Sequence, residues 1–243
     1  IERDLEVARQ IQKGLLPDAS PAIPGFELAG LNRPAEQTGG DYYDWQALPD
    51  GRVAVVMADV TGHGIGPALV MAVCRAYARA TAPLDPDPAS LLGRLNVLLS
   101  ADAKGARFVT LALAMLDADG TVELVSAGHG PSFLYRAATG QVEQFGGDGL
   151  PLAVLPEESY GPSRRLAMRE GDVLVMLTDG LVEWQDPQKS QFGADRLAAE
   201  IARHAGRPAA ELLGAIDQAV KHFAAGSPQN DDVTAVCIRR TAV

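Results

Sequence analysis

Four aspartates stand at the ends of four separate apolar runs, a position from which a carboxylate can bind a metal ion. They are Asp41 in TGGDYYDW, Asp59 after VAVVMA, Asp179 after DVLVMLT and Asp231 in QNDDVTAVCIRR. If the four strands meet at one edge of a sheet, like charges lie within a few ångströms of one another. Such crowding is unfavourable unless cations neutralise it. The pattern therefore predicts a metal site.

The donor type indicates which metal. Carboxylate, carbonyl and water oxygens suit Mg²⁺ or Mn²⁺, whereas zinc normally recruits His or Cys, and none of the four histidines has a partner at ligand spacing. Two such ions sharing one carboxylate and one water would activate that water against a phosphoryl group. A single Asp beside Gly is most often only a turn former or a helix cap. The recurrence at four strand ends favours a site for phosphate ester hydrolysis.

The residues around the aspartates support a cleft. Gly39 and Gly40 precede Asp41 and remove side-chain bulk where the backbone must approach a ligand. Asp59 leads into the glycine-rich stretch VTGHGIGPA, which predicts a junction between a strand and a helix. Asp232 leaves two interpretations open, because it either replaces Asp231 as a ligand or orients its neighbour by hydrogen bonds. Of the two, Asp231 is the preferred ligand.

Hydropathy patterning predicts how these residues are positioned. Short β-type runs separated by Gly, Asp-Gly and Pro turn signals indicate antiparallel strands. Helical periodicity comes in two sequential pairs, the first between the second and third predicted strands and the second before the last strand. This order is not the strict alternation of a parallel doubly wound sheet, and it predicts an α+β fold in which helices cover antiparallel sheets. The predicted strands are FELAGLN, RVAVVMADV, RFVTLALAMLD, TVELVSAGH, SFLYRAA, QVEQFG, DVLVMLTDG and VTAVCIRR, and the predicted helices cover 66–82, 88–102, 194–204 and 208–225.

Composition limits the class of protein. The 243 residues are 47% hydrophobic, enough for one domain with a sizeable core. A net charge of -10 argues against a nucleic-acid-binding surface. Cys74 and Cys237 lie in separate apolar segments, so neither a disulfide framework nor a CxxC metal site is indicated, and a reducing, cytoplasmic location is expected. Neither a membrane span nor a signal peptide is visible. Because the chain begins with Ile1, not Met, we expect it to be a fragment of a longer protein.

The N-terminal segment IERDLEVARQIQKGLLP predicts a helix that Pro17 stops. Its narrow apolar stripe consists of Leu5, Ala8, Ile11 and Leu15 or Leu16. Two interpretations remain open: a surface helix packed on its own domain, or the end of a linker or dimerising helix.

Seven motifs together resemble one known family. They are GGDYYD, ADVTGHGIGPALVM, FVTLALAMLD, LVSAGHGP, DGLPLAV, GDVLVMLTDGLVEW and QNDDVTAVCIRR, in this order. The chain resembles, from about Leu5 to Arg240, the bacterial stage II sporulation protein E type of metal-dependent protein phosphatase, in the PPM superfamily. Ordered motifs over nearly the whole chain are far more specific than any one Asp-Gly pair.

The resemblance implies an α-β-β-α sandwich of two antiparallel sheets flanked by helix pairs, with a two-metal site at one edge. It implies a linker or regulatory helix at 1–17 and a phosphatase domain at 18–243. By position, Asp41 and Asp59 correspond to ligands, with Asp59 as the bridge and the Val60 carbonyl as a backbone ligand. Asp179 and Asp231 correspond to the remaining ligands of two Mn²⁺ or Mg²⁺ ions.

The chain also departs from the family pattern. Eukaryotic relatives use a His two residues after the bridging Asp as general acid, where this chain has Thr61. His63 is therefore not carried over as catalytic; we interpret it as a turn residue, with proton donation as the alternative. His129, in SAGHGP, is interpreted as ordering a turn at a strand end. Arg33 is the positional candidate for the phosphate-binding Arg of the eukaryotic branch.

For function, the resemblance implies dephosphorylation of phosphoserine or phosphothreonine on a protein, typically the phosphorylated antagonist of an anti-sigma factor. It also implies an upstream sensor domain that acts through the N-terminal helix, and pairing of that helix makes a homodimer plausible. The loop GGDGLPLAVLPEESYG at 146–161 is interpreted as either a flap where a protein substrate docks or a plain surface loop. The alternatives are a catalytically silent scaffold that binds a signalling partner and a phosphatase of small molecules. The intact set of four aspartates argues against the scaffold, and the lack of a GxxxxGK[ST] nucleotide cradle argues against the small-molecule enzyme.

Overall fold

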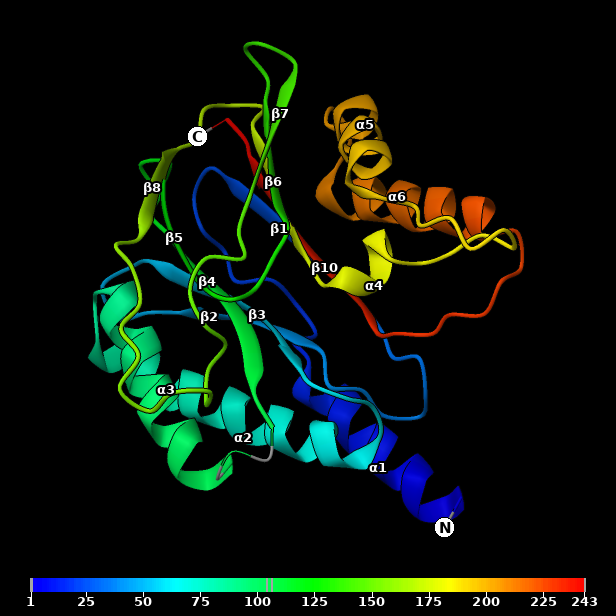
Figure 1. The fold of residues 1–243 in the computed structure, drawn as a ribbon. Helices are drawn as coiled ribbons and strands as arrows, with labels where there is room; N and C mark the ends of the chain where they lie inside the picture. The colour runs from blue at the N-terminus through cyan, green and yellow to red at the C-terminus, as the bar shows by residue number, and fades with distance from the viewer. Residues whose placement is uncertain (1, 104, 106, 243) are drawn as a thin grey trace.

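The computed structural model describes residues 2–103, 105 and 107–242. The described chain forms two β-sheets and three groups of helices (Figure 1). Its elements are α1 (Glu2–Leu15), β1 (Phe26–Arg33), β2 (Tyr42–Ala47), β3 (Val53–Val60), α2 (Ile65–Thr81), the short 3-10 helix η1 (Ala82–Leu84), α3 (Pro88–Ala103), β4 (Val109–Leu116), β5 (Thr121–Ala127), β6 (Ser132–Arg136), β7 (Gln141–Phe145), β8 (Arg164–Ala167), β9 (Val173–Leu177), α4 (Asp179–Val182), α5 (Ala194–His204), α6 (Ala209–Ala224) and β10 (Val233–Arg240).

All strand pairs in the two sheets are antiparallel. One sheet has the order β1-β10-β9-β6-β7 and the other the order β2-β3-β4-β5-β8. The helices α2 and α3 cover the outer face of the second sheet, and α5 and α6 cover the outer face of the first (Figure 1). The prediction of an α-β-β-α sandwich is confirmed.

The continuous apolar runs have a direct cause in this layering. Along β3, Val53, Val55 and Met57 face the core between the sheets. The alternating residues of the same strand, Ala54 and Val56 among them, face α2 and α3. Both faces of a central strand are therefore buried, so the strand is apolar at every position instead of every second one. The strands β9 and β10 are buried in the same way, with one face toward the core between the sheets and the other toward α5 and α6.

Three elements differ from the sequence prediction. The segment after Asp41 forms strand β2, the short β8 pairs with β5, and Asp179 begins the one-turn helix α4. With β2 counted, the first helix pair lies between the third and fourth strands. Charged and polar residues interrupt the apolar pattern of YYDWQA and RRLA, and tertiary packing decides such short segments more than propensity does.

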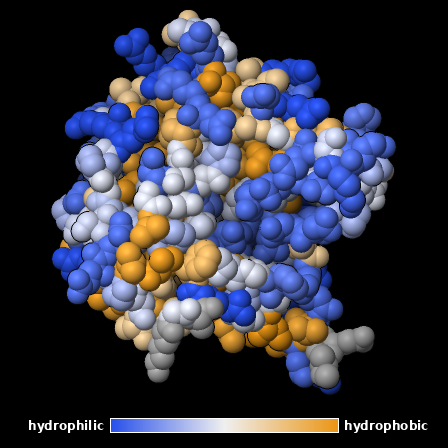
Figure 2. Space-filling model, in the orientation of Figure 1, coloured by the Kyte–Doolittle hydropathy of each residue, from blue (hydrophilic) through white to orange (hydrophobic). Residues whose placement is uncertain are grey.

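Helix α1 packs beside α2 near the lower edge of the view (Figure 1). Its burial differs from the predicted stripe, because Ile11 is 62% exposed whereas the polar Gln12 is buried. Val7 is also exposed on α1, and Ile65, Leu69 and Val73 are exposed along α2. Figure 2 shows hydrophobic side chains at the surface in this region. The helix therefore contacts the domain through the buried Gln12 and the half-buried Leu15, and it leaves the apolar Val7 and Ile11 uncovered.

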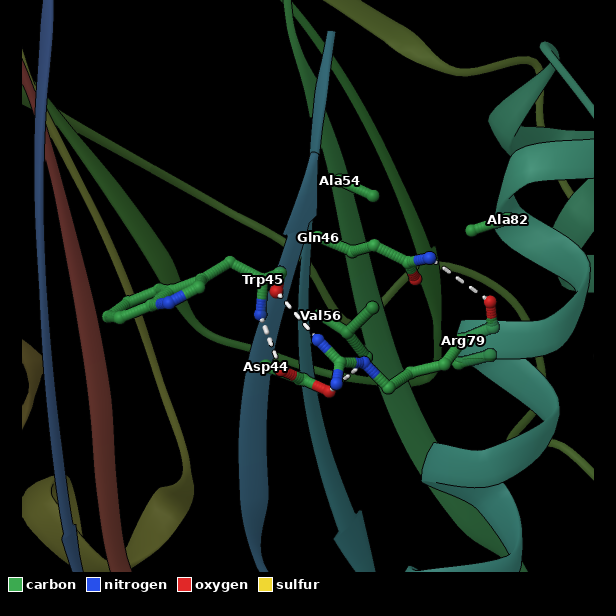
Figure 3. A pocket seen from close by; sticks show the side chains of 8 residues that line it. Asp44, Trp45, Gln46, Ala54, Val56, Arg79 and Ala82 are labelled. Atoms are coloured by element: carbon green, nitrogen blue, oxygen red, sulfur yellow. Dashed lines mark hydrogen bonds and ion pairs between the residues drawn. The ribbon is translucent and has the colours of Figure 1, made fainter. Parts of the chain in front are cut away.

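The buried carboxylate of Asp44 on β2 pairs with arginines of α2, and Figure 3 shows its contact with Arg79. The carboxylate of Asp44 lies 3.0 Å from Nε of Arg75 and 3.1 Å from Nε of Arg79. Burial raises the pKa of Asp44, and the two arginines oppose that rise. Gln46 also donates to the Arg79 carbonyl at 3.2 Å. These bonds fix the direction of β2, the strand that follows Asp41.

Candidate metal centre

The two sheets bring the predicted ligand segments to one edge of the sandwich. In one sheet, the Val60 N–H donates to the Gly40 carbonyl at 3.4 Å, next to the β2-β3 pairing of Tyr42 with Ala58. In the other sheet, the Thr178 N–H donates to the Thr234 carbonyl at 3.0 Å. The start of β2 and the end of β3 thus lie together, as do the end of β9 and the start of β10.

Asp41 connects the two sheets. Its side chain is buried, and its Oδ2 accepts a hydrogen bond from the Thr178 hydroxyl at 2.6 Å. Burial, followed by the charge of Asp59, raises the pKa of Asp41 well above its usual range, while the bond from Thr178 opposes that rise. The position therefore favours a positive charge beside the carboxylate.

Asp59 experiences the charges of the other acidic residues. Burial, followed by the carboxylates of Asp179 and Asp231, raises the pKa of Asp59 to about 7. Burial and the neighbouring Asp231 also raise the pKa of Asp179. A cation at this point would remove the cost of this repulsion, since a nearby opposite charge favours the ionised form.

Asp231 and Asp232 have different surroundings. Asp232 is buried, and its two oxygens accept backbone hydrogen bonds from Ala35 at 2.8 Å and from Gly40 at 2.7 Å, with Asp41 at a longer 3.4 Å. Asp231 is exposed, and within the described part of the chain its Oδ1 accepts only from the Asp232 N–H, at 2.8 Å. The Asp232 carboxylate therefore holds the loop that carries Asp41, whereas Asp231 keeps more free oxygen capacity.

Three glycines make this packing sterically allowed. A Cβ at Gly39 would collide with the carboxylate of Asp232, and a Cβ at Gly180 would collide with the Asp232 carbonyl. At Gly40 a Cβ would lie 2.5 Å from the Val60 carbonyl oxygen. The two loop glycines thus make room for a carboxylate on one side and for a backbone carbonyl on the other.

The donor set fits Mg²⁺ or Mn²⁺ chemically. The predicted donors are carboxylates and the Val60 carbonyl, hard oxygen ligands of the kind that these ions take. Within residues 2–103, 105 and 107–242, no three His, Cys, Asp or Glu side chains are grouped closely enough to form a finished metal site. Because an opposite charge beside a carboxylate favours its ionised form, a cation at this edge would stabilise the ionised carboxylates.

The histidines occupy positions without an evident proton-transfer role. His63 is exposed and lies 2.7 Å from Glu36 in an ion pair at the surface. His129 is buried, with Nδ1 2.9 Å from the Thr110 hydroxyl, and burial lowers its pKa to about 4. Its backbone N–H and carbonyl both bond the Ser126 hydroxyl, which orders the turn after β5.

Two arginines differ in their availability to an anion. Arg33 is occupied structurally, because Nη1 lies 2.8 Å from Asp217 and Nε donates to Gln229. Arg107 instead donates to the Thr61 carbonyl at 2.8 Å, and its guanidinium lies against Gly62 and Gly66. Among the described residues, no carboxylate forms an ion pair with Arg107. The better placed cation near the Asp59 turn is therefore Arg107, not Arg33.

Gln12 and Thr178 were not predicted from the sequence as site residues. The buried Gln12 amide donates to the Gly39 carbonyl at 2.6 Å and accepts from the Gly39 N–H at 3.1 Å. Helix α1 is thereby bonded to the loop that carries Asp41. A polar residue between the apolar Ile11 and Leu15 is the available sequence signal, but the residue's partner is 27 positions away.

The loop at 146–161 is anchored by one buried side chain. The Asn96 amide of α3 donates to the Leu155 carbonyl at 2.8 Å and accepts from the Ala153 N–H at 2.8 Å. Leu150, Val154 and Leu155 nevertheless remain partly exposed. The loop thus presents apolar side chains from a fixed backbone.

Comparison with known proteins places this chain in a family. The sequence model of the stage II sporulation protein E (SpoIIE) family matches residues 49–241. The chain belongs to the SpoIIE family. The solved SiaA-PP2C domain of Pseudomonas aeruginosa has the same fold as this SpoIIE-family chain, with a TM-score of 0.85, 22% identity and coverage of 98% of this chain and 95% of that one. The solved structure of RsbX in complex with magnesium matches with a TM-score of 0.67, 16% identity and coverage of 89% and 96%.

Curated members related to this SpoIIE-family chain are longer. Protein IcfG of Synechocystis sp. is 26% identical over 98% of this chain and 41% of its own length. Phosphoserine phosphatase RsbU of Bacillus subtilis is 28% identical over 75% of this chain and 54% of its own length. The chain thus spans about half the length of the curated relatives it matches. No helix in the described part is long and apolar enough to cross a membrane.

Proposed function

We propose that this protein is a metal-dependent serine/threonine phosphatase that hydrolyses phosphoserine or phosphothreonine on a regulatory protein. The observation that carries the proposal is the meeting of both sheets at one acidic edge, where partial burial and the charges of Asp179 and Asp231 raise the pKa of Asp59. Membership of the SpoIIE family and the name phosphoserine phosphatase borne by RsbU support it.

Two Mn²⁺ or Mg²⁺ ions are the proposed cofactors. Asp59 would bridge them, with Asp41 and the Val60 carbonyl on one side and Asp179 and Asp231 on the other. The ions would supply the positive charge that activates a water and stabilises the phosphoryl group. Asp232 is assigned a positioning role, because backbone N–H groups already occupy both of its oxygens.

The chain's own residues would prepare this site. Thr178 holds Asp41 in one orientation through its hydroxyl, and Asp232 fixes the backbone of Gly40. Arg107 is proposed to attract the substrate phosphate, since among the described residues only the Thr61 carbonyl accepts from its five N–H donors. No histidine is required as proton donor in this proposal.

Regulation is proposed to enter through the helix at 1–17, with the phosphatase domain at 18–243. The paired hydrogen bonds of Gln12 to Gly39 give a physical route from this helix to the Asp41 loop. An upstream sensor domain would act by moving that helix. The exposed Val7 and Ile11 beside the apolar residues of α2 favour a homodimer through the same helix.

The family resemblance suggests as substrate the phosphorylated antagonist of an anti-sigma factor, in the cytoplasm. The loop at 146–161 is proposed to contact that protein, because its apolar side chains are exposed on a backbone fixed by Asn96. The test is release of phosphate from such a phosphoprotein and from p-nitrophenyl phosphate with Mn²⁺ or Mg²⁺. Wild type should be active and Asp59→Asn should lose most activity.

The same assay separates the alternatives. A protein that hydrolyses p-nitrophenyl phosphate but leaves every phosphoprotein intact is a phosphatase of small molecules. If wild type and Asp59→Asn are equally inactive with both ions and both substrates, the chain is a scaffold.

A further inference from the structure

A basic groove lies between α5 and α6, on the outer face of the molecule. It encloses about 650 Å³ and is separate from the acidic edge described above. Residues from both helices, from the segment before α5 and from the connection between the helices line it. We call this set the basic groove: Phe192, Arg196, Ala199, Glu200, Arg203, His204, Arg207, Ala215, Gln218, Ala219, His222 and Phe223. The surface over α5 and α6 is mostly hydrophilic in Figure 2.

The charge of the groove opposes that of the whole chain. Its lining holds three arginines and two histidines against the single carboxylate of Glu200. With both histidines neutral, the groove therefore carries a net charge of +2, whereas the chain carries -10. A local positive field on an acidic protein concentrates acidic ligands at that place.

The basic side chains are only partly neutralised within the groove. Glu200 is shared by Arg203 at 2.5 Å and His204 at 3.3 Å. No side-chain hydrogen bond or ion pair joins Arg207 or His222 to another residue in the described part of the chain. At least one full positive charge is therefore available to a ligand.

One arginine is held in place before any ligand binds. The Arg196 guanidinium lies 4.8 Å from the centroid of the Phe223 ring and donates to the Phe192 carbonyl at 2.8 Å. Phe192 in turn packs edge-on against Phe223, with centroids 5.5 Å apart. A fixed guanidinium loses less side-chain entropy on binding than a free one.

The floor of the groove suits a peptide. Ala199 on α5 faces Ala215 and Ala219 on α6, and these small side chains create the hollow between the helices. Helix α5 has 11 residues, so the groove runs for about 16 Å. About five residues of extended chain cover that length.

We propose that the basic groove is a docking site for an acidic peptide segment of a partner protein. Arginine clusters are a recurrent means of recognising acidic motifs. A nucleic acid fits less well, because its charge continues far beyond the groove and meets a surface whose net charge is negative. The inference is independent of catalysis and does not require the proposed phosphatase activity.

The test measures binding of a short fluorescein-labelled peptide of glutamate and glycine by fluorescence anisotropy at low salt. The comparison probes are the same peptide with glutamine in place of glutamate and a single-stranded DNA of equal charge. The groove variant is Arg203→Glu with Arg207→Glu, and the matched control is Arg165→Glu with Arg169→Glu, two exposed arginines outside the groove. Both double variants change the net charge equally, and circular dichroism checks that both fold.

We expect the wild-type protein to show saturable binding of the glutamate peptide only. The groove variant should weaken that binding about tenfold or more, which equals about 1.4 kcal/mol. The control variant should change binding less than about twofold. Absence of saturable binding overturns the proposal, as does an equal effect of the two double variants. Tighter binding of the DNA shows a general polyanion site instead. A groove-dependent dimer on gel filtration shows that a second copy occupies the groove, which also overturns it.

Discussion

Replacing Asp231 and Asp232 separately by asparagine distinguishes a metal ligand from a positioning residue. Asparagine has nearly the same shape as aspartate but only one acceptor oxygen. Asp232 uses both oxygens for backbone N–H groups, so Asp232→Asn leaves at least one buried donor facing an amide NH₂. Losing a hydrogen bond to a charged group costs about 1.5–3 kcal/mol, and the unpaired donor adds to that cost. We expect a loss of about 2–4 kcal/mol in the free energy of unfolding.

The expected effect on melting follows from chain length. A domain of this size loses about 2–4 °C in Tm per kcal/mol, so Asp232→Asn should lower the metal-free Tm by about 5–15 °C. Asp231→Asn should leave the metal-free Tm within about 2 °C of wild type, because its side chain is exposed and asparagine keeps the Oδ1 acceptor. The two variants therefore differ before any metal is added.

Addition of Mn²⁺ gives the second readout. An ion at one hundred times its Kd stabilises the folded state by about 2.7 kcal/mol. Asp231→Asn should lose most of this stabilisation, whereas Asp232→Asn should keep a Mn²⁺-dependent rise in Tm from its lower starting value. Differential scanning fluorimetry with EDTA and with a Mn²⁺ series measures both. These roles would be reversed if Asp232→Asn melted like wild type in EDTA and lost the Mn²⁺ response while Asp231→Asn retained it. That result would refute Asp231 as the ligand and Asp232 as the positioning residue.

Three further predictions use the same site. Gly39→Ala should lower both Tm and Mn²⁺ affinity, because its Cβ collides with the Asp232 carboxylate. Gly214→Ala, which has open space around it, should be neutral or slightly stabilising. Equal Tm values for the two variants would contradict this prediction. The pKa of Asp59 is raised to about 7 in the folded protein, so between about pH 4 and 7 the folded state binds more protons than the unfolded state. The metal-free Tm should therefore fall as pH rises through that window. A Tm in EDTA that rises from pH 5 to pH 7.5 would count against this prediction. Gln12→Met should weaken Mn²⁺ binding, measured by calorimetry, since it removes both hydrogen bonds to Gly39. Gln10→Met, at an exposed position on the same helix, should not weaken it. Equal Mn²⁺ affinity of the two variants would exclude coupling between helix α1 and the Asp41 loop.

Much of the architecture could be predicted from the pattern of residues alone. Runs such as VAVVMA specify central strands, because a strand covered on both faces needs apolar side chains at every position. The helices at 88–103 and 194–204 follow from periodicity because each buries one face. By contrast, the pattern does not predict the strand Tyr42–Ala47, since the buried charge of Asp44 is balanced by arginines on α2, more than 30 residues along the chain.

The sequence by itself determined which residues carry the acidic chemistry, because carboxylates at the ends of apolar runs are visible in one dimension. Tertiary structure decided their roles. Asp231 and Asp232 are adjacent and chemically identical, and only the fold directs one into the backbone of the Gly40 loop and leaves the other exposed. The contact of Gln12 with Gly39 likewise joins residues far apart in the chain, and hydrogen-bond partners at that separation are set by packing and not by local pattern.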